Sequence, residues 1–128
     1  DCLLARGLGD VYKRQTLLIG LTAATIQAKP YTITAEDKAC TNRAEDYNEL
    51  ADCFNDIANK ALDHTEIQLK AKSKSLFNQF YKEAKKANQR CIKKYLVDDS
   101  PFSKAEKAQC SMDQTLKLGE KYDKLVNH

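Results

Sequence analysis

Glycine and proline are scarce in this chain. Its 128 residues include four glycines and two prolines, and neither type occurs between Tyr31 and Ser100. After residue 28 the only glycine is Gly119, which excludes a glycine-rich loop of the kind that cradles phosphate groups. Alanine, lysine, glutamate, leucine and glutamine, which all favour helices, are abundant in the same stretch. We therefore expect an all-α fold.

Residues that carry catalytic or metal chemistry are also few. Histidine occurs only at His64 and His128, and no two cysteines form a C-x-x-C pair, which disfavours a metal site. No serine lies in an elbow motif that would present a nucleophile, and no N-x-S/T sequence marks a glycosylation site. Adjacent carboxylates point apart on a helix, as in Glu36-Asp37, Glu45-Asp46 and Asp98-Asp99. We expect no enzymatic activity, no metal and no cofactor.

The first fifteen residues fit no helical or alternating pattern. The segment RGLGDVYKRQ, residues 6–15, resembles the sequencing-adapter read-through found at the ends of translated transcript assemblies. We interpret residues 1–15 as a non-native artefact and exclude them, with Cys2, from reasoning about the fold. The alternative is a genuine charged region ahead of a signal peptide, supplied by Lys13 and Arg14.

Residues 16–28, TLLIGLTAATIQA, carry no charge and end in small side chains. This pattern is typical of the apolar core and cleavage site of a signal peptide. The stretch is shorter than the roughly 20 residues that cross a bilayer as a helix, so we expect no stable membrane insertion. Cleavage is expected after Ala28, with Ala24 as the alternative, and a buried N-terminal helix is the other interpretation. The prediction is a secreted protein with a single helical domain over residues 29–128.

Three amphipathic runs follow. Their apolar residues recur three or four positions apart, except for the step of six from Leu116 to Tyr122, and this spacing predicts a helix for each run. The runs are Cys40, Ala44, Tyr47, Ala51, Phe54, Ala58 and Ala61; Phe77, Tyr81, Ala84, Ala87, Cys91 and Tyr95; and Ala105, Ala108, Met112, Leu116, Tyr122 and Val126. We expect a small, disulfide-stapled antiparallel bundle of three to four helices.

Capping residues suggest where these helices begin and end. Asp98 to Pro101 marks the clearest break, with Ser103 and Glu106 as a capping box for the last helix. The break between the first two long helices is expected near residues 63–66, with Thr65 as the cap. The alternative is the stretch of residues 72–75. Thr34 or Asp37 is expected to cap the first turn.

Four cysteines remain after Cys2 is set aside, and they allow three pairings. A helical hairpin turning near Ser100 places Cys91 opposite about residue 109, which favours Cys91–Cys110. The remaining pair, Cys40–Cys53, requires a bend, because 13 residues of continuous helix span about 19 Å. The alternative set, Cys40–Cys91 with Cys53–Cys110, would keep that helix straight.

Charge is divided unevenly along the chain. Residues 29–66 carry four basic and nine acidic side chains, whereas residues 67–97 carry nine basic side chains and one acidic, Glu83. One interpretation is that an acidic helix lies against a basic one. The functional hypothesis is an exposed cationic ridge that binds an anionic partner, made of Lys82, Lys85, Lys86, Arg90, Lys93 and Lys94. The neighbouring aromatic residues have core spacing, so no nucleic-acid binding is expected.

Two family resemblances bear on function. The segment CTNRAEDYNELADC, residues 40–53, resembles the repeated Cys…Tyr…Leu…Cys helical unit of TsetseEP-domain proteins, and GEKYDKL, residues 119–125, looks like a second unit that ends before its cysteine. This resemblance implies a secreted insect protein, often of the gut.

The other resemblance is to the four-cysteine ("C-minus") insect odorant-binding proteins. The intervals of 37 residues after Cys53 and 18 residues after Cys91 are similar to the last two intervals of that class, although the 12 residues after Cys40 are too few. The resemblance implies a hydrophobic ligand cavity lined by Phe54, Phe77, Phe80 and Tyr95. Their spacing alone indicates core packing.

These observations together predict a secreted, non-enzymatic binding protein that acts through its basic second helix. The expected partner is an extracellular protein or polysaccharide. The alternative is a carrier of small hydrophobic ligands. Alanine-rich stripes predict close helix packing without a cavity, which disfavours the carrier: Ala44, Ala51, Ala58, Ala61, Ala84 and Ala87.

Overall fold

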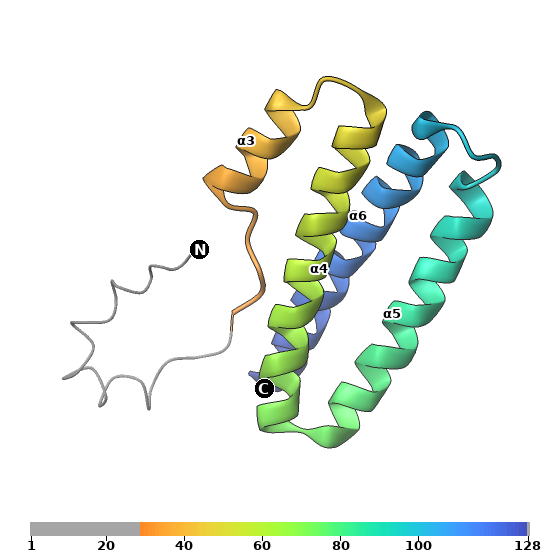
Figure 1. Ribbon diagram of the computed structural model, residues 1–128. Helices are drawn as coiled ribbons and strands as arrows, with labels where there is room; N and C mark the ends of the chain where they lie inside the picture. The colour runs from red at the N-terminus through yellow and green to blue at the C-terminus, as the bar shows by residue number, and fades with distance from the viewer. Residues whose placement is uncertain (1–28, 128) are drawn as a thin grey trace.

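Four helices make up most of residues 29–127, the part of the chain that the computed structural model describes. They are α3 (Ala35–Arg43), α4 (Tyr47–Lys72), α5 (Lys74–Tyr95) and α6 (Pro101–Val126), and the described residues contain no strand (Figure 1). The expected all-α, disulfide-stapled bundle is confirmed. The interpretations of residues 1–15 and 16–28 lie outside the described residues.

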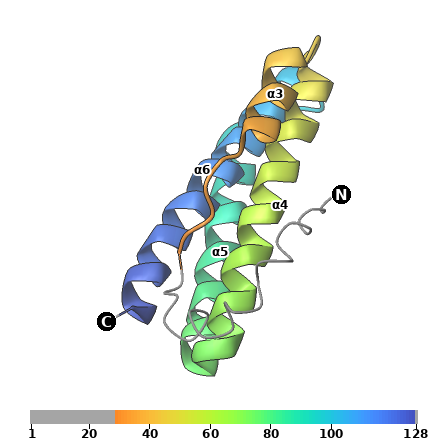
Figure 2. The same ribbon diagram turned by 90° about the vertical axis from the view of Figure 1, so that its left-hand side faces the viewer.

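The three long helices alternate in direction, so α4 and α6 run parallel and α5 runs antiparallel to both (Figure 1). α6 packs most extensively against α4 and next against α5, whereas α4 and α5 touch only sparsely. The short α3 and the extended residues before it lie along α4 (Figure 2). The side of the bundle between α4 and α5 is therefore its least closed side.

Small residues let α4 and α6 approach closely. Ala51 of α4 packs with Ala105 and Ala108 of α6. A second cluster along the same two helices contains Ile57, Ala58 and Met112. At Gly119 a Cβ atom would lie 3.1 Å from the Oγ1 atom of Thr65, closer than ordinary van der Waals contact. The alanine stripes therefore do produce close packing, but on this one interface.

All three long helices meet near the turn between α4 and α5. There Leu69, Phe80 and Tyr122 form a buried cluster, one residue from each helix. The rings of Phe80 and Tyr122 meet edge to face, with centroids 5.4 Å apart. This cluster is the main apolar anchor of α5.

The expected break near residues 63–66 is wrong. Thr65 is 4% exposed and lies inside α4, seven residues before its end. The buried stripe continues to Leu69, so ending the helix at Thr65 would expose that stripe. The alternative stretch holds the break, at Ser73. The Ser73 N–H donates to the carbonyl of Leu69, and its side chain accepts from the N–H of Leu76. One residue thus ends α4 and caps α5.

The last helix begins one turn earlier than the capping box predicted. Ser100 is the N-cap, its side chain accepts from the N–H of Ser103, and Pro101 occupies the first turn. The break at residues 98–101 is confirmed. At the other end of the chain Thr34 caps α3, with Asp37 completing a capping box.

Both disulfides join the favoured pairs. Cys40–Cys53 and Cys91–Cys110 have Cα–Cα distances of 5.8 Å and 5.7 Å. The expected bend lies between α3 and α4, where residues 44–46 turn the chain and Asp46 caps α4. The first disulfide holds α3 against α4, and the second holds the upper half of α5 against α6.

Candidate functional site

Six basic side chains give α5 a cationic surface, which we call the α5 basic face. All six residues of the predicted ridge are exposed: Lys82, Lys85, Lys86, Arg90, Lys93 and Lys94. Lys82, Lys86 and Lys93, four and seven residues apart, lie in one row along the helix, on the side away from the buried Phe80 and Cys91. The row extends about 16 Å.

Acidic side chains do not neutralise this face directly. Ion pairs within residues 29–127 join Lys60 to Asp37 and Asp56, and Lys121 to Glu83. None of these pairs includes a residue of the α5 basic face. The interpretation that acidic α4 lies against basic α5 is not realised as ion pairs, because the two helices touch only sparsely. The cationic charge is therefore available to a ligand.

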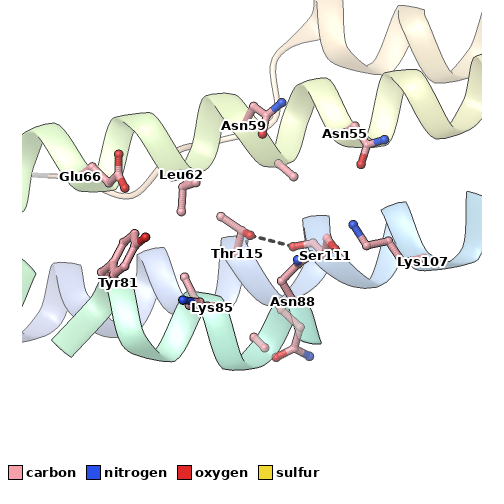
Figure 3. A pocket seen from close by; sticks show the side chains of 14 residues that line it. Asn55, Asn59, Leu62, Glu66, Tyr81, Lys85, Asn88, Lys107, Ser111 and Thr115 are labelled. Carbon is pink, nitrogen blue, oxygen red and sulfur yellow. Dashed lines mark hydrogen bonds between the residues drawn. The ribbon is translucent and has the colours of Figure 1, made fainter. Parts of the chain in front are cut away.

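A groove lined by both polar and apolar side chains separates α4 from α5, with α6 behind it (Figure 3). Its volume is about 400 Å³, within the range of small-molecule sites, about 300–1,000 Å³. Side chains of all three helices line it: Asn55, Ala58, Asn59, Leu62, Glu66, Tyr81, Ala84, Lys85, Ala87, Asn88, Lys107, Ser111, Gln114 and Thr115. We refer to it as the α4–α5 groove.

A second hollow of about 540 Å³ continues the groove toward the turn between α5 and α6. It shares Asn55 and Lys107 with the first hollow and adds Asn48, Ala51, Asp52, Ile92, Leu96 and Lys104. The two hollows together follow α4 from Asn48 to Glu66, about 27 Å along the helix. The groove is thus long enough for an elongated ligand.

Hydrogen bonds fix part of the groove floor. The buried Ser111 hydroxyl donates to the Oδ1 atom of Asn88 at 2.9 Å, and the Thr115 hydroxyl donates to the Ser111 carbonyl at 2.7 Å. By contrast, the side-chain amides of Asn55, Asn59 and Gln114 make no hydrogen bond to other residues in the described part of the chain. These amides are open to a ligand, and neither histidine nor cysteine lines the groove.

The four residues predicted to line a ligand cavity lie elsewhere. Phe80 is fully buried, and Phe54 and Phe77 pack against the core clusters. Tyr95 lines a separate hollow of about 230 Å³ with Cys110 and Lys117. Neither hollow of the α4–α5 groove contains any of the four.

Close packing of the alanine stripes is found between α4 and α6, whereas α4 and α5 leave an open groove between them. The residues of α5 that line this groove include Tyr81, Lys85 and Asn88, which are exposed and polar. The sequence does not predict the groove, because most of the residues that line it are polar in type and lie outside the apolar stripes that mark the helices. The available signal was the recurrence of asparagine within helices, where it is a weak helix former.

Residues 29–127 contain no group of three or more histidine, cysteine or acidic residues arranged to hold a metal ion. None of α3 to α6 is both long and apolar enough to span a bilayer.

Comparisons of the chain with protein-family models, with curated proteins and with solved structures find no match. The resemblances to TsetseEP-domain proteins and to odorant-binding proteins therefore stay predictions.

Proposed function

We propose that this is a secreted, non-enzymatic binding protein that uses the α5 basic face to hold an acidic extracellular polysaccharide. The observation that carries the proposal is a row of exposed lysines without acidic partners on a rigid helix. A polysaccharide with regularly spaced carboxylate or sulfate groups presents the complementary charge pattern. A long charged row favours such a partner over a compact anion.

Support for an extracellular location comes from two features. Two disulfides in a small domain are typical of proteins made in an oxidising compartment. The uncharged stretch of residues 16–28 is typical of a signal peptide. We expect the secreted chain to begin at Lys29, whose carbonyl is held to α4 by the side chains of His64 and Gln68.

A nucleic-acid partner is less well supported. Single strands are generally held by stacking bases on exposed aromatic rings along a basic groove. Among the aromatic residues of α5, Tyr81 is exposed, whereas Phe80 is buried and Phe77 and Tyr95 are half-buried. The basic row therefore lacks the repeated stacking platforms that such a partner uses.

Salt-dependent retention of residues 29–128 on a heparin column tests the proposal. Replacing Lys82, Lys86 and Lys93 with glutamate should make the protein elute at clearly lower salt. When the logarithm of the binding constant is plotted against the logarithm of the salt concentration, each lost contact should reduce the steepness of the slope by about 0.7–0.9, by analogy with nucleic acids. The matched control replaces three exposed lysines outside α5, Lys38, Lys117 and Lys124, with glutamate and therefore changes the net charge by the same amount. Equal loss of retention in both triple variants would contradict the proposal.

A carrier of small hydrophobic ligands is the alternative. Its support is weak, because three of the four aromatic residues assigned to such a cavity, Phe54, Phe77 and Phe80, pack in or against the core clusters. Binding of a fluorescent hydrophobic probe such as anilinonaphthalene sulfonate to the native protein, displaced by fatty acids, would favour this alternative.

A further inference from the structure

Asparagine is concentrated along the α4–α5 groove. The helices α4, α5 and α6 contain five asparagines, and four of them line the two hollows: Asn48, Asn55, Asn59 and Asn88. Asn78 on α5 is the exception. Asparagine weakens a helix interior, because its side chain competes for backbone hydrogen bonds. Its repeated use on one surface therefore calls for a reason other than helix formation.

The fold makes little use of these amides. Asn48, Asn55 and Asn59 form no side-chain hydrogen bond to another residue within 29–127, and Asn88 uses only its Oδ1 atom, as acceptor from Ser111. A primary amide offers two donors and an acceptor, so it pairs well with groups that also do both. Hydroxyl groups on a sugar ring are such groups. The α4 side of the groove thus presents a row of amides suited to a polyhydroxylated ligand.

The opposite side and the floor supply cations and a ring. Lys85 of α5 and Lys107 of α6 line the groove, and neither forms an ion pair with the described residues. Tyr81 is 53% exposed at the rim, and Figure 3 shows its ring standing at the mouth of the groove, across from Glu66. Lysines favour carboxylate or sulfate groups, and an exposed aromatic face can cover the apolar face of a sugar ring.

We propose that the α4–α5 groove binds a short stretch of an acidic saccharide. In this arrangement Asn55 and Asn59 pair with hydroxyl groups, Lys85 and Lys107 with carboxylate or sulfate groups, and Tyr81 covers a ring face. The inference rests on the proposed function for the class of partner. Of the residues that it uses, only Lys85 also belongs to the α5 basic face. The α5 basic face attracts the polymer through charge, and the groove selects for sugar hydroxyls.

An extended peptide is the competing occupant, because amides also pair with a peptide backbone. The observations favour the saccharide. Three of the four aliphatic residues that line the first hollow are alanines, Ala58, Ala84 and Ala87, and only Leu62 is larger. The first hollow therefore offers few apolar pockets for peptide side chains, and the larger apolar residues of the groove, Ile92 and Leu96, lie in the second hollow. The two lysines instead match the repeated charges of an acidic saccharide.

The test measures binding of two anionic probes to residues 29–128 by calorimetry: a heparin-derived tetrasaccharide and an oligoglutamate of equal charge. The variants Asn55→Leu and Asn59→Leu remove amides without changing net charge, and Asn78→Leu is the matched control outside the groove. Circular dichroism checks that each variant folds. We expect each groove variant to bind the tetrasaccharide at least about threefold more weakly, because each loses one hydrogen bond. Oligoglutamate binding and the control should stay unchanged.

The outcomes separate this inference from the proposed function. If the groove variants bind the tetrasaccharide like the native protein, the groove inference is wrong, whatever the α5 basic face does. If oligoglutamate binding falls with tetrasaccharide binding in Asn59→Leu, the groove holds a peptide backbone and the inference is also wrong. If the triple variant of Lys82, Lys86 and Lys93 binds the tetrasaccharide normally while Asn59→Leu does not, the groove inference stands and the proposed role of the α5 basic face fails.

Discussion

A buried carboxylate connects the start of the described chain to the bundle. Asp37 is 2% exposed and accepts hydrogen bonds from the Tyr31 hydroxyl at 2.5 Å and from the Lys60 ammonium at 3.1 Å. Burial alone would raise the pKa of this carboxyl group. The hydrogen bonds from Tyr31 and from the Thr34 amide outweigh burial and hold the pKa below its ordinary value of 3.8.

This network makes the protein sensitive to acid. Because the pKa of Asp37 is lower in the folded than in the unfolded chain, its contribution to stability is complete above about pH 4 and is lost as the pH falls further. Replacing Tyr31 with phenylalanine removes a hydrogen bond to a charged acceptor. We expect the free energy of unfolding at pH 7 to fall by about 1.5–3 kcal/mol. We also expect the midpoint of acid unfolding to move to higher pH, measured by circular dichroism.

The control for this substitution is Tyr47→Phe. Tyr47 is 48% exposed, its ring lies against that of Phe102, and its hydroxyl makes no hydrogen bond to the described residues. Its loss should change neither the stability nor the acid midpoint. If both variants behave alike, the Tyr31 hydroxyl does not hold the Asp37 carboxylate as the structure indicates.

Among the helices, α4 and α6 make one of their close contacts at Gly119. Valine at position 119 would direct its Cβ atom to 3.1 Å from Thr65 Oγ1, with two further methyl groups to accommodate. Overpacking of this kind costs about 1–3 kcal/mol. We therefore expect Gly119→Val to lower the free energy of unfolding by that amount in denaturant titrations. The exposed Lys117→Val on the same helix is the control and should have a much smaller effect.

A second substitution checks the cause of that effect. If the contact with Thr65 is responsible, Thr65→Ala should be less harmful in the Gly119→Val background than in the native chain. Additive effects of the two substitutions would show that valine disturbs α6 in some other way.

The positions of the three long helices were predictable from the sequence, but the boundary between α4 and α5 was not. The runs of apolar residues identify all three long helices, because a buried stripe requires this spacing. Thr65 was mistaken for a cap because threonine is a good capping residue and Gln68 follows three positions later. A sequence read alone does not reveal that Gly119, more than fifty residues away, makes room to bury Thr65. At Thr65, burial against α6 outweighs the local preference of threonine for a capping position.

The candidate site was predictable only in part for a similar reason. The exposed cations of α5 follow from composition and spacing, because lysine is rarely buried without a partner. The α4–α5 groove depends on how three helices are placed relative to one another. The asparagines that line it are spread over two helices and have no apolar stripe to mark them. A charged surface on one helix can thus be predicted from the sequence of that helix, whereas predicting a groove requires the arrangement of all three helices.

In the molecule as a whole, the two disulfides hold different pairs of helices together. Cys40–Cys53 holds α3, which also has the contacts of Asp37 with α4. Cys91–Cys110 holds the half of α5 that lies far from the buried Phe80 cluster and has few contacts with α4. The second disulfide therefore maintains one wall of the α4–α5 groove.

Removing each disulfide separately tests this division. By loop-closure entropy, replacing either pair with alanine should lower the free energy of unfolding by about 3 kcal/mol, since the loops span 13 and 19 residues. The local effects should differ. Without Cys91–Cys110, native-state hydrogen exchange should accelerate over residues 88–95 of α5, because that segment would then depend on packing against α6 and on the hydrogen bond between Ser111 and Asn88. Without Cys40–Cys53, the acceleration should be confined to α3 and the start of α4. Equal exchange of residues 88–95 in both variants would mean that packing against α6 alone keeps the groove wall in place.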